Sequence, residues 1–166
     1  MQTNVNDMKD QKNQSPSLPT ILFLSWFYTG KSPKAPGTIG SLATIPLILF
    51  LHFLQINIYS LIALITVLFV ASVVITERVQ KKYHLHDPQW IVIDEVLGML
   101  VTWAFVQQVD FVSLLVVFGT FRFFDIVKIW PASYFDRLEH GAGTISDDIV
   151  SGLYAGILSF YILKLF

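Results

Sequence analysis

Apolar residues dominate five stretches of the chain, and short polar segments separate them. The stretches run from about Ser41 to Leu54, Ile58 to Thr76, Trp90 to Val106, Phe111 to Val127 and Asp147 to Phe166. A helix needs about 20 residues to cross the hydrocarbon core of a bilayer, and most of these stretches approach that length. The pattern predicts an all-α, multi-pass membrane protein with about four to five apolar helices. Because Ser41–Leu54 is short, the number of true spans stays open.

Two segments precede these stretches. Residues 1–19 are polar and rich in Asn and Gln, and they lack the apolar core and small-residue cleavage site of a signal peptide. We predict a disordered tail there, followed by a membrane-embedded domain over residues 20–166. The apolar, aromatic segment Ile21–Gly30 is too short to span. We expect it to be interfacial or re-entrant, with Trp26 and Tyr28 at the level of the lipid headgroups.

The composition supports a membrane location and excludes several classes of function. Hydrophobic residues make up 54% and charged residues 14% of the 166 positions, whereas globular chains average about 45–50% and 25%. A net charge of -1 argues against a nucleic-acid surface. The chain has no cysteine, which excludes disulfides, zinc–thiolate sites and the cysteine phosphatase mechanism.

Charged residues gather on one side of the predicted bundle. If the helices form hairpins with turns at Gln55 and Gln107, only Lys164 of the 11 basic residues falls on the side of those turns. The others share the opposite side: Lys9, Lys12, Lys31, Lys34, Arg78, Lys81, Lys82, Arg122, Lys128 and Arg137. The positive-inside rule makes that side cytoplasmic. All of the 12 acidic residues except Asp110 lie there too, which the rule does not require.

The segment Ser32–Ser41, SPKAPGTIGS, has the features of a phosphate cradle. Gly37 lets the backbone approach a ligand closely, and Thr38 and Ser41 supply hydroxyls at the start of a helix, where free N–H groups favour an anion. Lys31 or Lys34 would lie nearby. The alternative interpretation is a simple helix N-cap after a turn.

Asp94 and Glu95 are adjacent carboxylates inside an apolar run. Asp87-Pro88 has the form of a helix start, which places both acids about one and a half turns into the helix. Ionised carboxylates near membrane depth usually mark a functional cavity or an ion pair. The alternative to a functional role is therefore a salt bridge with Arg122 or Lys128.

Two further segments carry charge. Arg122, Asp125 and Lys128 recur every three residues and so line roughly one helical face. Asp147 and Asp148 are predicted to open the last helix, where they would serve either a site or helix capping. In that helix Gly152 and Gly156 have the four-residue spacing that permits close helix packing. Trp130 and Tyr134 are expected to be interface anchors, and the scattered His84, His86 and His140 make zinc binding improbable.

The five carboxylates come from three predicted helices and lie near the same cytoplasmic boundary. They are Asp94, Glu95, Asp125, Asp147 and Asp148. So many acids would repel one another unless cations held them, and ligands that are all oxygen select Mg²⁺ or a similar hard ion. Arg122, Lys128 and Lys34 could neutralise a phosphate. This combination suits hydrolysis or transfer at a lipid headgroup.

The motifs PGTIGS, DPQWIVIDEVLG, FRFFDIVKIWP and GTISDDIVSG resemble, in this order, those of the phosphatidylglycerophosphatase A family. The resemblance covers about Ser32 to Gly156. It implies an Mg²⁺-dependent enzyme of the bacterial inner membrane that removes the terminal phosphate of phosphatidylglycerophosphate. Where the family usually has Lys-Pro-Trp-Pro, this chain has Ile129 in place of the first proline.

The resemblance and the charge pattern together give one hypothesis for the site. The catalytic residues would be Asp94, Glu95, Asp125, Asp147 and Asp148. Asp94 and Glu95, with Asp147 or Asp148 or both, would hold one or two Mg²⁺ ions. The phosphate would be bound by Lys34, Thr38, Ser41, Arg122 and Lys128.

Two functions of other classes remain open at this point. One is a small proton or ion translocator, although it would need polar groups through the whole bilayer and the outer halves of these helices are nearly all apolar. The other is a non-catalytic membrane subunit with salt-bridged acidic clusters. The partner implied is a phospholipid substrate, with no nucleic acid and no protein partner.

Overall fold

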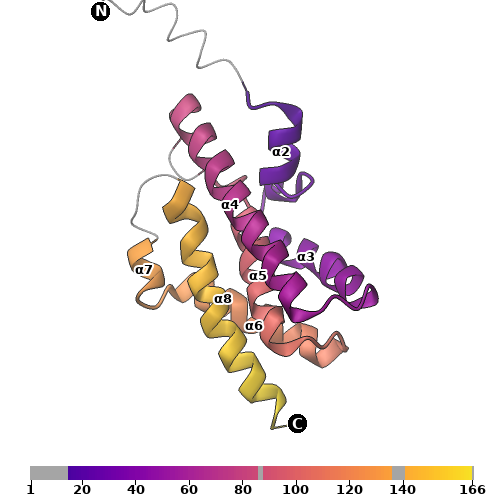
Figure 1. Ribbon diagram of the computed structural model, residues 1–166. Helices are drawn as coiled ribbons and strands as arrows, with labels where there is room; N and C mark the ends of the chain where they lie inside the picture. The colour runs from indigo at the N-terminus through magenta and orange to yellow at the C-terminus, as the bar shows by residue number, and fades with distance from the viewer. Residues whose placement is uncertain (1–14, 86–87, 136–140, 166) are drawn as a thin grey trace, which may run out of the picture.

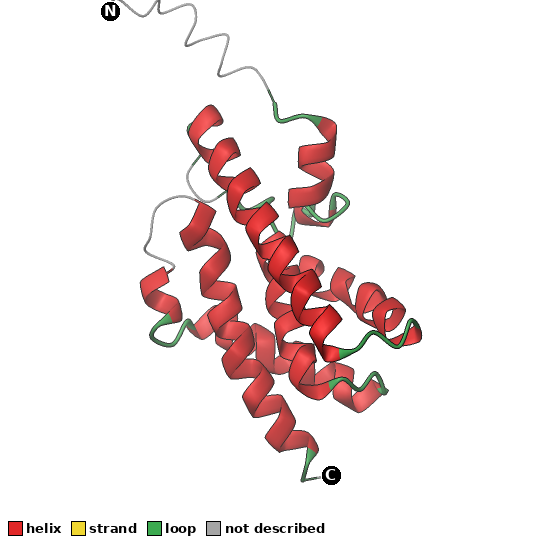
Figure 2. Cartoon of the chain, viewed as in Figure 1, coloured by secondary structure: helices red, strands yellow, loops and turns green. Residues whose placement is uncertain are grey.

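The computed structural model describes residues 15–85, 88–135 and 141–165, and these residues form helices without any strand (Figures 1 and 2). The all-α prediction is confirmed. The elements are α2 (Leu18–Leu24), the 3₁₀ helix η1 (Thr29–Lys31), α3 (Pro36–Phe53), α4 (Ile58–Tyr83), α5 (Ile93–Val106), α6 (Phe111–Val127), α7 (Ala132–Phe135) and α8 (Gly141–Leu163). Most of the predicted disordered tail lies outside the described residues, as do His86, Asp87, Arg137 and His140.

Three helices are long and apolar enough to cross a membrane, namely α3, α4 and α8. The other two predicted spans are shorter, because α5 has 14 residues and α6 has 17. At 1.5 Å per residue α5 extends about 21 Å, well short of the roughly 30 Å of a bilayer core, whereas α6 is only one residue shorter than α3. Most of α5 is buried, so it forms the centre of the bundle.

The ends of several helices differ from the prediction. Only α6 matches it at both ends. α4 continues past Thr76 to Tyr83, and an ion pair of 2.6 Å between Glu77 and Lys81, one turn apart, contributes to the helical conformation of this charged segment. Similarly, α8 begins at Gly141 and not at Asp147. The placement of Asp147 and Asp148 at a helix start was therefore wrong.

The start of α5 was also placed wrongly. The backbone N–H of Val92 donates to the carbonyl of Leu24, and Val92 has φ -137°. This bond to the end of α2 keeps the preceding residues out of the helix. α5 consequently begins at Ile93, and Asp94 and Glu95 occupy its first turn.

α5 and α8 pack at very short distance through glycines. A Cβ added to Gly152 would lie 2.6 Å from the carbonyl oxygen of Gly98 on α5, and one added to Gly156 would overlap the ring of Phe105. The close packing predicted for Gly152 and Gly156 is confirmed. Figure 1 shows α4 and α8 running along α5, with α3 beside α5 and α6 packed mainly against α8. This arrangement brings the first turn of α5 against the N-terminal part of α8.

The turn between α2 and η1 contacts both α3 and the segment before α5. Trp26, Phe27 and Tyr28 all have positive φ, between 44° and 70°. The indole Nε1 of Trp26 donates to the carbonyl of Ala43 on α3 at 3.1 Å, while Phe27 is exposed. Gly30 packs against the carbonyl of Trp90. The turn therefore ties the start of α3 to the segment that precedes α5.

Candidate active site

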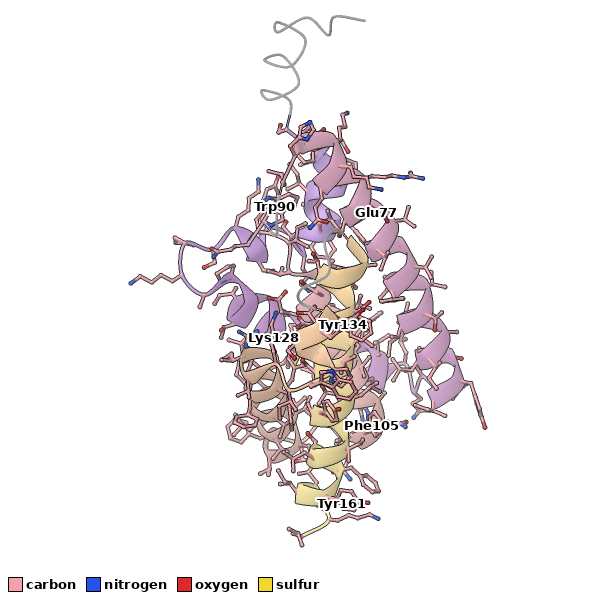
Figure 3. All side chains as sticks on the ribbon, turned by 90° about the vertical axis from the view of Figure 1, so that its left-hand side faces the viewer. Glu77, Trp90, Phe105, Lys128, Tyr134 and Tyr161 are labelled. Atoms are coloured by element: carbon pink, nitrogen blue, oxygen red, sulfur yellow. The ribbon has the colours of Figure 1, made fainter. Side chains whose placement is uncertain are left out.

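Four helices bring the predicted site residues together. The residues lie in the first turns of α3 and α5, at the end of α6 and in the N-terminal half of α8. Lys128, at the end of α6, lies at mid-height of the molecule, between Glu77 towards one end and Tyr161 towards the other (Figure 3). Asp147 and Asp148 are buried, so the site lies inside the bundle.

Asp94, Glu95 and Asp148 form the centre of the site. One carboxylate oxygen from each lies within 4.8 Å of the other two, close enough to share a metal ion. The backbone N–H of Glu95 donates to Asp94 Oδ1 at 3.1 Å, and the N-terminus of α5 favours the negative charge. Glu95 Oε2 is buried and has no hydrogen-bond partner among the residues that the structure describes. A buried carboxylate oxygen in this position needs a cation or a donor.

Arg122 and Asp125 form the second part of the site. Arg122 Nη1 pairs with the carboxylate of Asp125 and lies 3.5 Å from Ser41 Oγ on α3. Asp125 in turn is within electrostatic reach of Asp148. Arg122 Nε is buried and has no partner in the described part of the chain, so the guanidinium keeps a donor for a further ligand.

Gly37 lets the first turn of α3 reach this group. A Cβ at Gly37 would overlap Glu95 Oε1 and would lie 3.3 Å from Arg122 Nη1. The N-cap of α3 is Ala35, whose side chain offers no hydrogen bond, and Ser41 Oγ donates to the carbonyl of Gly37. The N-cap interpretation of the serine and threonine is therefore not supported. The first N–H groups of α3 have no side-chain cap and lie beside Arg122.

Lys128 contacts a carboxylate. Its Nζ lies 2.6 Å from Asp147 Oδ2, and the side chain of Asp147 is 6% exposed. Lys128 is the C-cap of α6, with φ 46°, so it lies beyond the helical face of Arg122 and Asp125. The salt bridges foreseen as an alternative for Asp94 and Glu95 thus form with Asp125 and Asp147 instead.

The remaining predicted phosphate ligands lie at the edge of the site. Thr38 is half-buried in the first turn of α3, next to Gly37. Lys34 is exposed in the loop before α3. Neither side chain has a hydrogen bond or ion pair with another site residue in the described part of the chain. Both lie close in sequence to the uncapped N-terminus.

The balance of charge favours bound cations. Among the residues that the structure describes, five carboxylates of the site face two basic side chains, Arg122 and Lys128, and these seven groups carry a formal charge of -3 when all are ionised. Acids held this close repel one another unless cations compensate them. The converging donors are all oxygen, which suits Mg²⁺ or another hard divalent ion. The residues therefore fit a metal site.

Sequence reasoning missed two features around the site. Gly98, in the second turn of α5, allows the carbonyl of Asp148 to lie 2.8 Å from where a Cβ would be. A buried polar face of α4 was also missed. Ser72 and Thr76, in an apolar stretch, and Gln80, in the charged segment that follows it, could have been recognised from their four-residue spacing.

Comparison with known proteins decides the family. The sequence profile of phosphatidylglycerophosphatase A matches residues 22–163, which is most of the chain and includes every residue of the site. The chain belongs to the phosphatidylglycerophosphatase A family. The resemblance carried by the four motifs is thereby confirmed.

Curated relatives support this membership. The phosphatidylglycerophosphatase A of Haemophilus influenzae is 35% identical over 95 residues, or 57% of this chain and 58% of the relative. The phosphatidylglycerophosphatase A of Escherichia coli is 38% identical over 91 residues, or 54% of this chain and 53% of the relative. The chain thus matches little more than half the length of these relatives. A Bacteroides thetaiotaomicron protein that is 32% identical over 74 residues is described as a candidate phosphatidylinositol-3-phosphatase. No solved structure matches the chain.

Proposed function

We propose that this protein is a phosphoric monoester hydrolase of bacterial phospholipid synthesis, which converts phosphatidylglycerophosphate to phosphatidylglycerol and inorganic phosphate. The observation that carries the proposal is the convergence of Asp94, Glu95 and Asp148 beside Arg122 and the uncapped start of α3. Carboxylates there can hold a cation, and the adjacent donors can hold a phosphate. The names of two relatives state the same activity.

Asp94, Glu95 and Asp148 would hold Mg²⁺. When bound, the metal would polarise the phosphoryl group and lower the pKa of a coordinated water. Glu95 Oε2, buried without a partner, supports this assignment. Asp147 belongs to the predicted metal set too, but its contact with Lys128 favours a role in positioning its neighbour Asp148.

The phosphate would lie between Arg122 and the first turn of α3. Arg122 Nε and the N–H groups of Gly37 and Thr38 are the available donors. Asp125 orients the guanidinium through their ion pair and is near enough to Asp148 to orient a water. Ser41 would hold both groups in place, because its Oγ donates to the carbonyl of Gly37 and lies 3.5 Å from Arg122 Nη1. Lys34, in the loop before α3, would attract the anionic headgroup. Lys128 would act on the phosphate only indirectly, through Asp147.

The proposed location is the bacterial inner membrane, with the site open to the cytoplasm. α3, α4 and α8 can cross a bilayer, which supports a multi-pass protein. The basic residues that precede α3, end α4 and end α6 would then share the cytoplasmic side.

Phosphate release from the purified protein tests the proposal. Phosphatidylglycerophosphate, phosphatidic acid and phosphatidylinositol 3-phosphate would be offered separately in mixed micelles, with and without Mg²⁺. We expect Mg²⁺-dependent release, fastest from phosphatidylglycerophosphate. A translocator or a non-catalytic subunit would release none, and faster release from either other lipid would replace the proposed substrate.

A further inference from the structure

α4 carries a line of buried polar side chains that the proposed chemistry does not use. Ser72 and Thr76 are fully buried and Gln80 is 5% exposed. Their four-residue spacing puts them on one face of the helix. The rest of α4 is apolar enough to cross a membrane, so a continuous polar face inside the protein requires a physical reason.

The oxygens of this face lack hydrogen-bond partners. Serine and threonine hydroxyls in helices commonly donate to the carbonyl four residues earlier, and Thr44, Thr66 and Thr102 all do so here at 2.8–3.0 Å. Within residues 15–85, 88–135 and 141–165, Ser72 Oγ, Thr76 Oγ1 and Gln80 Oε1 have no hydrogen-bond partner. Both hydroxyls thus lack the bond to their own helix, and leaving them unpaired in a dry interior would be costly.

This polar face borders α8 and continues towards the carboxylates. Gln80 Nε2 donates to Thr144 Oγ1 at 3.1 Å, and Thr144 precedes Asp147 and Asp148 by one helical turn. At Gly141 the helices touch, because a Cβ there would lie 2.6 Å from the backbone of α4 at Val73 and Glu77. Figure 1 shows α4 and α8 side by side along this seam.

Water is the ligand that fits. Neutral oxygens offer no charge for an anion or a strongly held cation. Internal water typically occupies sites where buried polar groups would otherwise be unsatisfied. Gln80 lies next to the exposed Lys81 and Lys82 at the end of α4, where water is available. A file of waters along Gln80, Thr76 and Ser72 would satisfy each oxygen.

We propose that the Ser72–Thr76–Gln80 face lines a water-filled seam between α4 and α8, which supplies water to the carboxylate site. This role rests on the proposed function, because hydrolysis consumes one water per phosphate. The ester R–O–PO₃²⁻ and H₂O give R–OH and HPO₄²⁻. The water oxygen bonds to phosphorus, the bond from phosphorus to the ester oxygen breaks, and that oxygen takes a proton.

Single-cysteine labelling tests whether the seam is hydrated, and the chain contains no native cysteine to interfere. The variants Ser72→Cys and Thr76→Cys would be exposed to Ag⁺ in proteoliposomes, and the remaining free thiol counted with a fluorescent maleimide after denaturation. Ag⁺ reacts with thiolate, which needs water to form. Thr66→Cys, on the exposed face of the same helix, is the lipid-facing control, and Lys31→Cys is the control in water.

We expect Ser72→Cys and Thr76→Cys to react much faster than Thr66→Cys. Adding Gln80→Leu should slow both reactions by closing the outer end of the seam. Reaction as slow as that of Thr66→Cys would show a dry interface and overturn the proposal. Fast labelling unaffected by Gln80→Leu would overturn the proposed route. Labelling requires no turnover, so these outcomes are independent of whether the protein hydrolyses phosphatidylglycerophosphate.

Discussion

Gly37 lies where the first turn of α3 meets the carboxylate of Glu95 and the guanidinium of Arg122. A side chain at this position would overlap Glu95 Oε1. The glycine is needed for space here, since it lies in a regular helix and its φ is not positive. A substitution at Gly37 is therefore expected to disturb the site and not the backbone of α3.

Gly37→Ala should lower phosphate release about 10- to 100-fold, because displacement of a catalytic group by about 1 Å has costs of that order. The matched control is Gly119→Ala on α6, where an added Cβ meets nothing within 4 Å. That change should keep full activity and raise helix stability by up to about 1 kcal/mol. Initial rates and thermal unfolding in detergent measure both effects. Full activity in Gly37→Ala would contradict the assigned position of Glu95.

At the scale of helices, three contacts hold the end of α6 against α8. Lys128 pairs with Asp147, Ser151 Oγ lies 3.5 Å from the carbonyl of Phe124, and the Tyr154 hydroxyl donates to the carbonyl of Trp130. Asp125 and Asp148 belong to the two helices joined in this way. The Lys128–Asp147 pair is therefore expected to position the site without touching the substrate.

A double-mutant cycle tests that role. Lys128→Met and Asp147→Asn should each lower kcat with KM nearly unchanged, and the double variant should be no worse than either, giving a coupling of about 0.5–3 kcal/mol. Lys128→Arg should restore most of the activity. The exposed pair Lys81–Glu77 serves as control, with an expected effect of about 0.3–0.5 kcal/mol on stability and none on kcat. Additive losses with a raised KM would instead place Lys128 on the substrate phosphate.

Asp110, the N-cap of α6, is expected to make the stability of the folded protein depend on pH. Asp110 accepts hydrogen bonds from the Ser113 hydroxyl and from the N–H groups of Ser113 and Val112, and these bonds lower the pKa of its carboxyl. A lowered pKa in the folded state gives stability that is present above the unfolded pKa and is lost as pH falls through the folded pKa. Unfolding of Asp110→Asn, followed below about pH 4, should lose less stability with acid than the wild type does. Equal losses would contradict the capping role.

At the scale of the whole molecule, the helical fold and the site composition could be predicted from the sequence because both depend on local pattern. α6 was predicted at both ends. Asp94 and Glu95 were named as candidate ligands from their place in an apolar run, and Asp148 from its place in the last helix near the same predicted membrane boundary; the three carboxylates do lie together. What could not be predicted depends on contacts between distant segments. The bond from Val92 to Leu24 sets the start of α5, and the backbone of α4 accommodates the start of α8 at Gly141.

The pairing of charges was also beyond the sequence. Arg122, Asp125 and Lys128 share a spacing, but the left-handed C-cap at Lys128 turns that side chain to Asp147. The three side chains would share one face only if the helix continued through all three residues, whereas α6 ends at Val127. On the basis of that spacing Lys128 was predicted to bind the phosphate together with Arg122, whereas the end of α6 and the contact with Asp147 lead us to propose a positioning role for it.

The orientation of the bundle is tested by labelling whole cells. Single-cysteine variants Ser32→Cys, in the loop before α3, and Asn57→Cys, in the turn before α4, should differ in their reaction with a membrane-impermeant maleimide. We expect Asn57→Cys to react from outside and Ser32→Cys to react only after the inner membrane is opened, as the positive-inside rule requires. The reverse result would place the site on the periplasmic side.

The central claim is that Asp94, Glu95 and Asp148 hold the metal that phosphate release requires. The most direct measurement is phosphate release from phosphatidylglycerophosphate during an Mg²⁺ titration of the wild type, Asp94→Asn and Asp148→Asn, with Asp110→Asn as control. We predict Mg²⁺-dependent release by the wild type and the control. Both site variants should insert into the membrane and release no phosphate at any Mg²⁺ concentration. Normal release by Asp94→Asn and Asp148→Asn would contradict the metal site.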